Sequence, residues 1–82
     1  MSAPIYHCWL EEDGPRCAED VEGRPYDDPE DFAERFAEAV YEATRGEIGE
    51  NFVVIVEAPD GTTTRHAIDV DHYATFSATR KM

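Results

Sequence analysis

The most regular hydrophobic pattern in the chain is an apolar residue at every fourth position across its middle. Phe32, Phe36 and Val40 recur at this interval with alanines beside them, which is the spacing of one buried face of a helix. An N-cap aspartate followed by proline favours a helix start, and an arginine followed by glycine favours its end. These boundary signals are Asp28, Pro29, Arg45 and Gly46. The pattern therefore predicts a helix over residues 29–45.

Shorter stretches on both sides of this helix have the composition of β-strands. Residues 5–10 alternate Ile5, His7 and Trp9 with Tyr6, Cys8 and Leu10. A turn at 11–15 then leads to a weaker strand, because two acids interrupt it. We expect strands at 5–10, 16–21, 51–58, 62–70 and 73–78, and a tail at 79–82.

A Pro-Asp-Gly turn joins the two strongest strands. If Gly61 adopts the left-handed conformation in a three-residue loop, the register of the hairpin follows. The expected pairs are Val56 with Thr64, Val54 with His66, and Phe52 with Ile68. That face, which ends at Val70, is the expected core. The opposite face carries Val53, Ile55, Glu57, Arg65, Ala67 and Asp69.

Together these elements predict one α+β domain over residues 1–82, with a small antiparallel sheet of three to five strands. One helix covers only one face of such a sheet. The second face, with Val53 and Ile55, is then left partly open. Two interpretations remain: this face binds a partner or a second copy of the chain, or the terminal segments fold over it.

The charge of the chain narrows the classes of partner. The 82 residues include 19 acids and 7 bases, which gives a net charge of −12, while 41% of the residues are hydrophobic. This balance disfavours binding to free DNA, RNA or an anionic membrane, and it favours a protein with a basic surface. The alternative is that the acidity only reflects the composition of the source genome or a salt-rich cell.

The chain shows neither a signal peptide nor an apolar run of the roughly 18 residues that a membrane span needs. We therefore expect a cytoplasmic protein, in the host cell if the gene belongs to a phage. Cysteines in that compartment stay reduced. A turn centred on Asp13-Gly14 would place Cys17 opposite Leu10 rather than Cys8. Both cysteines are therefore expected to be buried free thiols.

Four glutamates lie four residues apart along the predicted helix, on one stripe. Like charges at this spacing cost a few tenths of a kcal/mol per pair, so the stripe is not a stabilising arrangement. Such carboxylates can imitate phosphates, although a rise of about 6 Å gives only half the density of one DNA strand. Acids in the turn would have to extend the stripe, and a tyrosine could anchor the contact. The candidate partner-binding residues are Glu11, Glu12, Asp13, Glu30, Glu34, Glu38, Glu42, Tyr26 and Tyr41.

Catalytic and metal-binding patterns are weak in this sequence. No nucleophile, nucleotide or zinc signature is present. His66, Asp71 and His72 could form a small metal-dependent enzyme site. However, His66 and Asp69 differ by three positions and point to opposite faces of a strand. We expect no catalytic residue, no metal and no cofactor, with the metal enzyme as the more distant alternative.

Two segments resemble parts of small phage-type proteins: the capped helix in DDPEDFAERFAEA, from Asp27, and the hairpin FVVIVEAPDGTTTRHAIDV. With the acidity and the short chain, they are similar in style to anti-CRISPR and other anti-defence inhibitors. One helix on a small sheet is also similar to antitoxins with a partial RNase-H-like fold. The first resemblance implies a non-enzymatic inhibitor that blocks a nucleic-acid-binding surface. The second implies an acidic antitoxin. The remaining alternative is a small homodimeric structural protein that uses the Val53 and Ile55 face.

Overall fold

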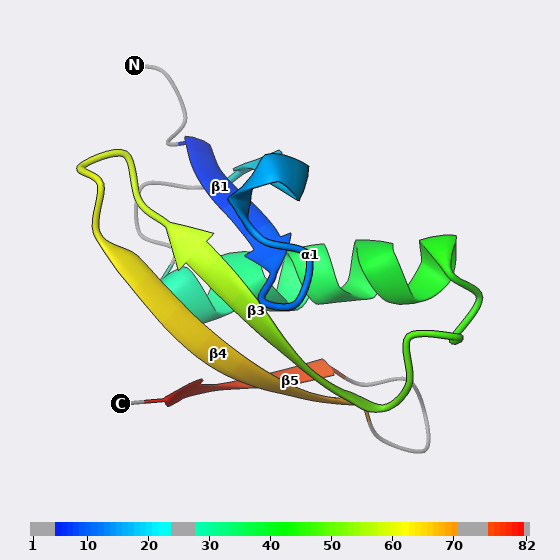
Figure 1. Ribbon diagram of the computed structural model, residues 1–82. Helices are drawn as coiled ribbons and strands as arrows, with labels where there is room; N and C mark the ends of the chain where they lie inside the picture. Colours follow the sequence, from blue (N-terminus) through cyan, green and yellow to red (C-terminus); the bar gives the residue numbers. More distant parts are fainter. Residues whose placement is uncertain (1–4, 24–27, 71–75, 82) are drawn as a thin grey trace.

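The computed structural model describes residues 5–23, 28–70 and 76–81 of the chain. Five strands form one antiparallel sheet in the order β2-β1-β3-β4-β5, and the helix α1 packs along one face of it (Figure 1). The predicted α+β class, with one helix on a small antiparallel sheet, is confirmed. The elements are β1 (Ile5–Leu10), the 3-10 turn η1 (Pro15–Cys17), β2 (Glu19–Glu22), α1 (Pro29–Ala43), β3 (Asn51–Glu57), β4 (Thr63–Val70) and β5 (Phe76–Lys81).

The β3–β4 hairpin has the predicted register. Val56 pairs with Thr64, Val54 with His66, and Phe52 with Ile68. Gly61 has a φ of 92°, which is the left-handed conformation that the turn requires. The Asp60 carboxylate accepts a hydrogen bond of 2.9 Å from the Thr62 amide, so the turn is held by its own residues. This hydrogen bond also lowers the pKa of Asp60.

The second strand begins later than predicted. Strand β2 starts at Glu19 rather than at residue 16, and η1 occupies the interval before it. Pro15 explains the difference, because its fixed φ suits the first position of a helical turn and it has no amide hydrogen for a ladder. The Ala18 amide closes the turn by donating to the Pro15 carbonyl at 3.2 Å. Cys17 therefore lies in η1 and is exposed, so the prediction that both thiols are buried is wrong for Cys17.

The helix begins as predicted and ends two residues early. At its start, the Asp28 amide donates to Asp31 Oδ2 at 3.0 Å. At its end, the Gly46 amide donates to the Tyr41 carbonyl at 2.9 Å and the Arg45 amide to the Glu42 carbonyl at 3.2 Å. These two bonds form a Schellman motif, in which the residue after the cap is left-handed. Arg45, with φ 54°, takes that position.

The last strand also differs from the prediction. Strand β5 covers Phe76–Lys81 and pairs antiparallel with β4 as far as Arg65↔Lys81. The predicted tail at 79–82 is thus largely strand, and the predicted start of this strand at 73–75 lies outside the described residues. The polar end of the chain carries no local strand signal. It becomes a strand because β4 offers a free edge along its length.

The core lies between α1 and the sheet. The buried helix residues Phe32, Ala33, Phe36 and Ala37 pack against Cys8, Val54, Val56, Ile68 and Val70. Tyr6 stacks on Phe32 with ring centroids 3.9 Å apart. Gly23 lies so close to this ring that a Cβ there would be 2.3 Å from Phe32 Cζ. Two polar groups share this core: His66, fully buried with Nε2 2.7 Å from Thr64 Oγ1, and the Cys8 thiol.

Candidate partner-binding surface

The acidic stripe lies on the helix face that points away from the sheet. The buried residues of α1 lie on the opposite side of the helix, and the four glutamates follow the outer side at four-residue spacing. Glu38 and Glu42 are exposed, whereas Glu30 and Glu34 are half-buried. This placement agrees with the predicted helical pattern, and it leaves the Glu38 and Glu42 carboxylates facing solvent.

The one arginine within α1 is directed away from this stripe. Arg35 donates to the Glu22 carbonyl at 3.3 Å and lies 5.7 Å from the centroid of the Phe32 ring. In the described part of the chain, no cation lies within ion-pair distance of Glu34, Glu38 or Glu42. Their mutual repulsion is therefore not offset by a neighbouring base.

The turn acids do not extend the stripe. Glu11 forms an ion pair with Arg65, and Arg65 lies on the sheet face opposite α1, because its neighbours Thr64 and His66 face the helix side. Glu12 and Asp13 are exposed in the turn that follows β1. The structure thus divides the predicted acids between two regions, the outer side of α1 and the end of β1.

Of the two candidate aromatic anchors, only Tyr41 lies among the described residues. Tyr41 is half-buried and packs against the hydrophobic core, and its ring lies beside Gly46 at the end of the helix. Only part of the Tyr41 ring therefore remains available to a partner. Tyr26 lies outside the described residues.

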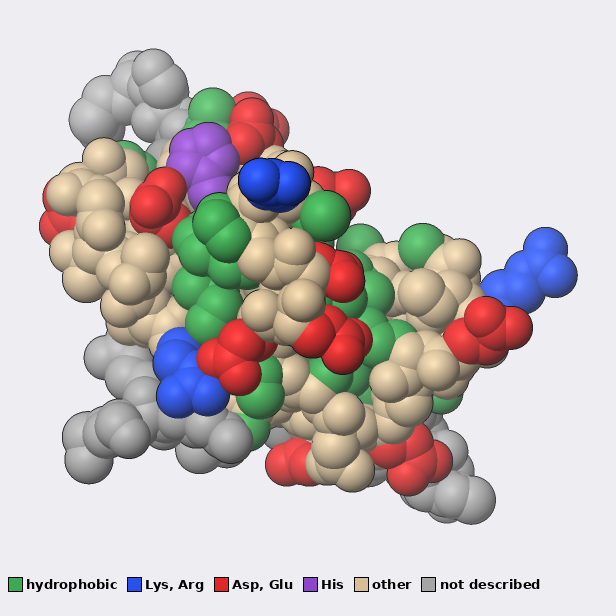
Figure 2. Space-filling view, in the orientation of Figure 1, with side chains coloured by type: hydrophobic (Ala, Val, Ile, Leu, Met, Phe, Trp, Pro, Cys, Tyr) green, Lys and Arg blue, Asp and Glu red, His purple; other side chains and the backbone are tan. Residues whose placement is uncertain are grey.

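Sequence reasoning missed the role of Trp9 on the second face of the sheet. Trp9 pairs with Ile55 across β1 and β3, and each is only 9% exposed. Figure 2 shows a band of hydrophobic side chains on this face with acidic side chains next to it. Among the described residues, Ile5 is the exposed large hydrophobic residue, at 42%. The alternation of Ile5, His7 and Trp9 was a usable signal, but it did not reveal which strand lies beside β1.

A hollow opens where β1 ends and β3 begins. The paired region of these strands stops at Leu10↔Val54, and the Glu11 amide makes one more bond, of 3.0 Å, to the Val53 carbonyl. Past this point the first residues of β3 have no β1 neighbour, and the segment after α1 closes the other side. The resulting hollow, called here the end hollow, has a volume of about 280 Å³ and is lined by Leu10, Glu11, Glu12, Ile48, Asn51, Phe52 and Val53.

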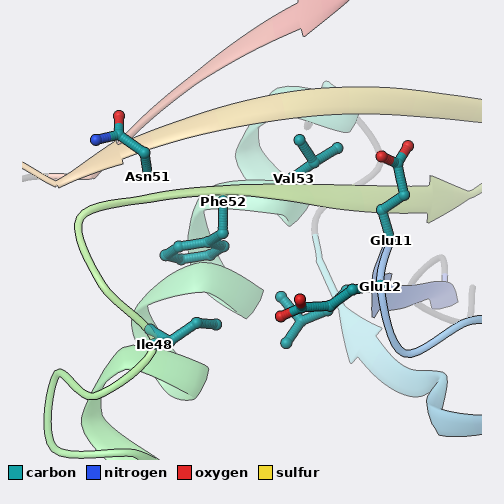
Figure 3. Close-up of a pocket in the computed structure, with 7 residues that line it drawn as sticks. Glu11, Glu12, Ile48, Asn51, Phe52 and Val53 are labelled. Atoms are coloured by element: carbon teal, nitrogen blue, oxygen red, sulfur yellow. The ribbon is translucent and has the colours of Figure 1, made fainter.

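Figure 3 shows how these side chains are directed. Phe52 points from β3 toward Ile48 and the helix side, whereas Asn51 and Val53 point to the other face of the strand. Glu12 is directed into the end hollow and Glu11 away from it. The end hollow therefore combines an apolar floor with one carboxylate that has no ion-pair partner among the described residues.

The described residues contain no cluster of side chains for the predicted alternative of a metal site. Over residues 5–23, 28–70 and 76–81, no three His, Cys, Asp or Glu side chains are grouped to hold a metal ion. His66 is buried in the core, and Asp71 and His72 lie outside the described residues. Within the same ranges, no helix has the length and apolar character to cross a membrane.

Comparison with protein-family models, with curated proteins and with solved structures finds no match to this chain.

Proposed function

We propose that this chain is a non-enzymatic binding protein that blocks a basic, nucleic-acid-binding surface of another protein, in the manner of an anti-CRISPR inhibitor. The observation that carries the proposal is the line of Glu34, Glu38 and Glu42 on the outer side of α1, which have no ion-pair partner among the described residues. Glu38 and Glu42 are exposed and Glu34 is half-buried, and the one arginine within α1 lies over the Phe32 ring.

The energetics of the stripe support a role outside folding. Each like-charge pair at four-residue spacing destabilises the helix by a few tenths of a kcal/mol. Because the net charge is −12, the field around the protein attracts basic surfaces and repels nucleic acids. Such complementarity raises the association rate and makes it fall steeply with salt. An inhibitor that competes with nucleic acid needs these two properties.

The alternative of a homodimer or antitoxin through the second sheet face has less support. Ile55 is 9% exposed and is already covered in part by its cross-strand pair with Trp9. Val53 is half-buried. A stable dimer needs a well-packed apolar centre, and these two side chains offer little accessible apolar area.

The test compares three forms of the protein as baits in nuclease-treated lysate of the source cell. One variant carries Glu34→Gln, Glu38→Gln and Glu42→Gln. A matched variant carries Glu19→Gln, Glu47→Gln and Glu50→Gln, all at exposed positions away from the stripe. Each variant has a net charge of −9, since −12 + 3 = −9. Captured proteins are then purified, and their binding to nucleic acid is measured with and without each form.

We expect the wild type and the matched variant to capture a nucleic-acid-binding protein at low salt, to release it at high salt, and to displace its nucleic acid. The stripe variant should bind roughly tenfold more weakly, as three exposed charge pairs imply. Equal weakening of both variants would show that only net charge matters. A captured protein that keeps its nucleic acid would refute the inhibitor.

A further inference from the structure

We infer that the end hollow receives one arginine side chain of the partner protein. The inference rests on the proposed function, because it takes the partner to be a protein with a basic surface. It adds one specific binding site to the long-range electrostatic attraction of the acidic stripe.

The size of the end hollow favours a single side chain over a small-molecule ligand. Pockets for drug-sized ligands have volumes of roughly 300–1,000 Å³. The end hollow has about 280 Å³ and is open to the surface at the point where β1 leaves β3 (Figure 3). A long, narrow group that enters from solvent fits this volume.

The lining of the end hollow suits a group that is apolar along its length and cationic at its tip. Leu10, Ile48 and Phe52 provide apolar surface, against which the methylene groups of an arginine can pack while the charged head stays near water. The aromatic ring of Phe52 also favours a nearby guanidinium. Each of these contacts would be lost with a compact inorganic cation.

The charge in the end hollow comes from Glu12. Glu11 is engaged by Arg65 on the other side of the strand, whereas Glu12 is exposed and directed into the end hollow (Figure 3). None of the side chains that line the end hollow is basic. A carboxylate accepts two parallel hydrogen bonds from a planar guanidinium. This geometry favours arginine over lysine, whose ammonium is a compact point charge.

The test uses a defined probe, so that it does not depend on finding the partner. The peptide N-acetyl-Gly-Arg-Gly-amide is titrated into the ¹⁵N-labelled full chain, and amide shifts are followed by NMR. The same peptide with citrulline is the neutral control of equal shape. Glu12→Gln removes the proposed carboxylate, and Asp13→Asn removes one equal charge from the same turn at a position that does not line the end hollow.

We expect saturable shifts at Glu12, Ile48, Asn51 and Phe52 with the arginine peptide and much smaller shifts with citrulline. Glu12→Gln should weaken binding about threefold or more, the scale of one partly exposed charge pair, while Asp13→Asn leaves it nearly unchanged. Shifts spread along the outer side of α1, or equal weakening by both variants, would overturn the assignment. If the peptide does not bind but the wild type still captures a nucleic-acid-binding protein through the stripe, only the inference that the end hollow binds arginine is refuted. If the peptide binds and no such protein is captured, the proposed function is refuted and the end hollow remains an arginine-binding site.

Discussion

The two faces of the five-stranded sheet are stabilised in different ways. On the face under α1, Cys8, Val54, Val56 and Ile68 are each at most 1% exposed and form one apolar cluster with the helix. The opposite face also carries exposed polar contacts: Arg65 pairs with Glu11, and His7 Nδ1 lies 2.7 Å from Asp20 Oδ1. Trp9 and Ile55 add one apolar pair between them.

This difference indicates which contacts stabilise the fold. Apolar burial contributes about 25 cal/mol per Å², so the helix-covered face supplies most of the stabilising energy. Exposed ion pairs contribute about 0–1 kcal/mol each, so on the opposite face the buried Trp9 and Ile55 side chains contribute more than the ion pairs do. The surfaces proposed for binding, namely the outer side of α1 and the end hollow, can therefore change with little effect on the fold. Five measurements test this contrast.

The largest contrast should appear in the reactivity of the two thiols. Burial raises the pKa of Cys8 to about 12, so at neutral pH it is a protonated thiol inside the core, whereas Cys17 is exposed. With a thiol reagent under native conditions, we expect one thiol per chain to react promptly and the second more than about a hundredfold more slowly, through unfolding. Equal rates for both thiols would contradict the burial of Cys8.

The same shift predicts a pH dependence. The unfolded chain loses the Cys8 proton above its ordinary pKa of 9.0, while the folded protein keeps it until about 12. The stabilisation is therefore complete below pH 9 and is lost progressively as the pH rises from about 9 to 12. Urea unfolding across this range should show a steeper loss for the wild type than for Cys8→Ala.

Phe32→Ala should cause the largest loss of stability among the substitutions considered. Phe32 is fully buried, stacks on Tyr6 and is contacted closely by Gly23, so truncation leaves a cavity. We expect a loss of about 3–5 kcal/mol in the free energy of unfolding, measured by urea denaturation. Ile5→Ala, on the opposite face and 42% exposed, should change it by less than about 0.5 kcal/mol. Similar losses for the two variants would refute the contrast between the faces.

Adjacent valines on β3 provide a closer comparison. Val54 is fully buried under α1, and Val53 is half-buried on the other face. Val54→Ala should lower the free energy of unfolding by about 1.5–3 kcal/mol, from lost burial and a residual cavity, and Val53→Ala by about 1 kcal/mol or less. If Val53→Ala is the more destabilising variant, the second face contributes more to stability than its exposure indicates.

The smallest effect concerns the acidic stripe itself. The combined change Glu34→Gln and Glu38→Gln removes like-charge repulsion on the outer side of α1. We expect the free energy of unfolding to stay the same or to rise by about 0.2–0.5 kcal/mol. Thermal unfolding should show this as an unchanged or slightly higher midpoint. The pair Glu19→Gln and Glu47→Gln gives the same net charge without touching the stripe. If the stripe variant unfolds and the control variant does not, these glutamates are structural, and the proposed function loses its basis.

Local chemistry made some of the fold predictable. The helix start followed from the Asp28–Pro29 pair, and the β3–β4 register followed from the turn at Gly61, because both signals act over a few residues. The late start of β2 and the early end of α1 also have local causes. Pro15 starts a 3-10 turn, and Arg45 takes the left-handed position that glycine usually occupies at a helix end.

The candidate site was predictable only in part. The helical period placed Glu34, Glu38 and Glu42 on one outer stripe, and the structure agrees. The end hollow could not be predicted, because Glu12 lies far along the chain from Ile48 and Phe52. They meet only because β1 inserts between β2 and β3, a pairing for which no local signal exists.

The sequence by itself determined the α+β class, the helix with its acidic outer side, and the hairpin with its core face. Each depends on a periodicity or a turn within a few residues, where backbone geometry decides the outcome. Tertiary structure alone decided the position of β1 beside β3, the burial of Trp9 against Ile55, the strand at Phe76–Lys81, and the end hollow. These depend on contacts between distant segments, whose pairing is selected by burial of the whole core rather than by any local pattern.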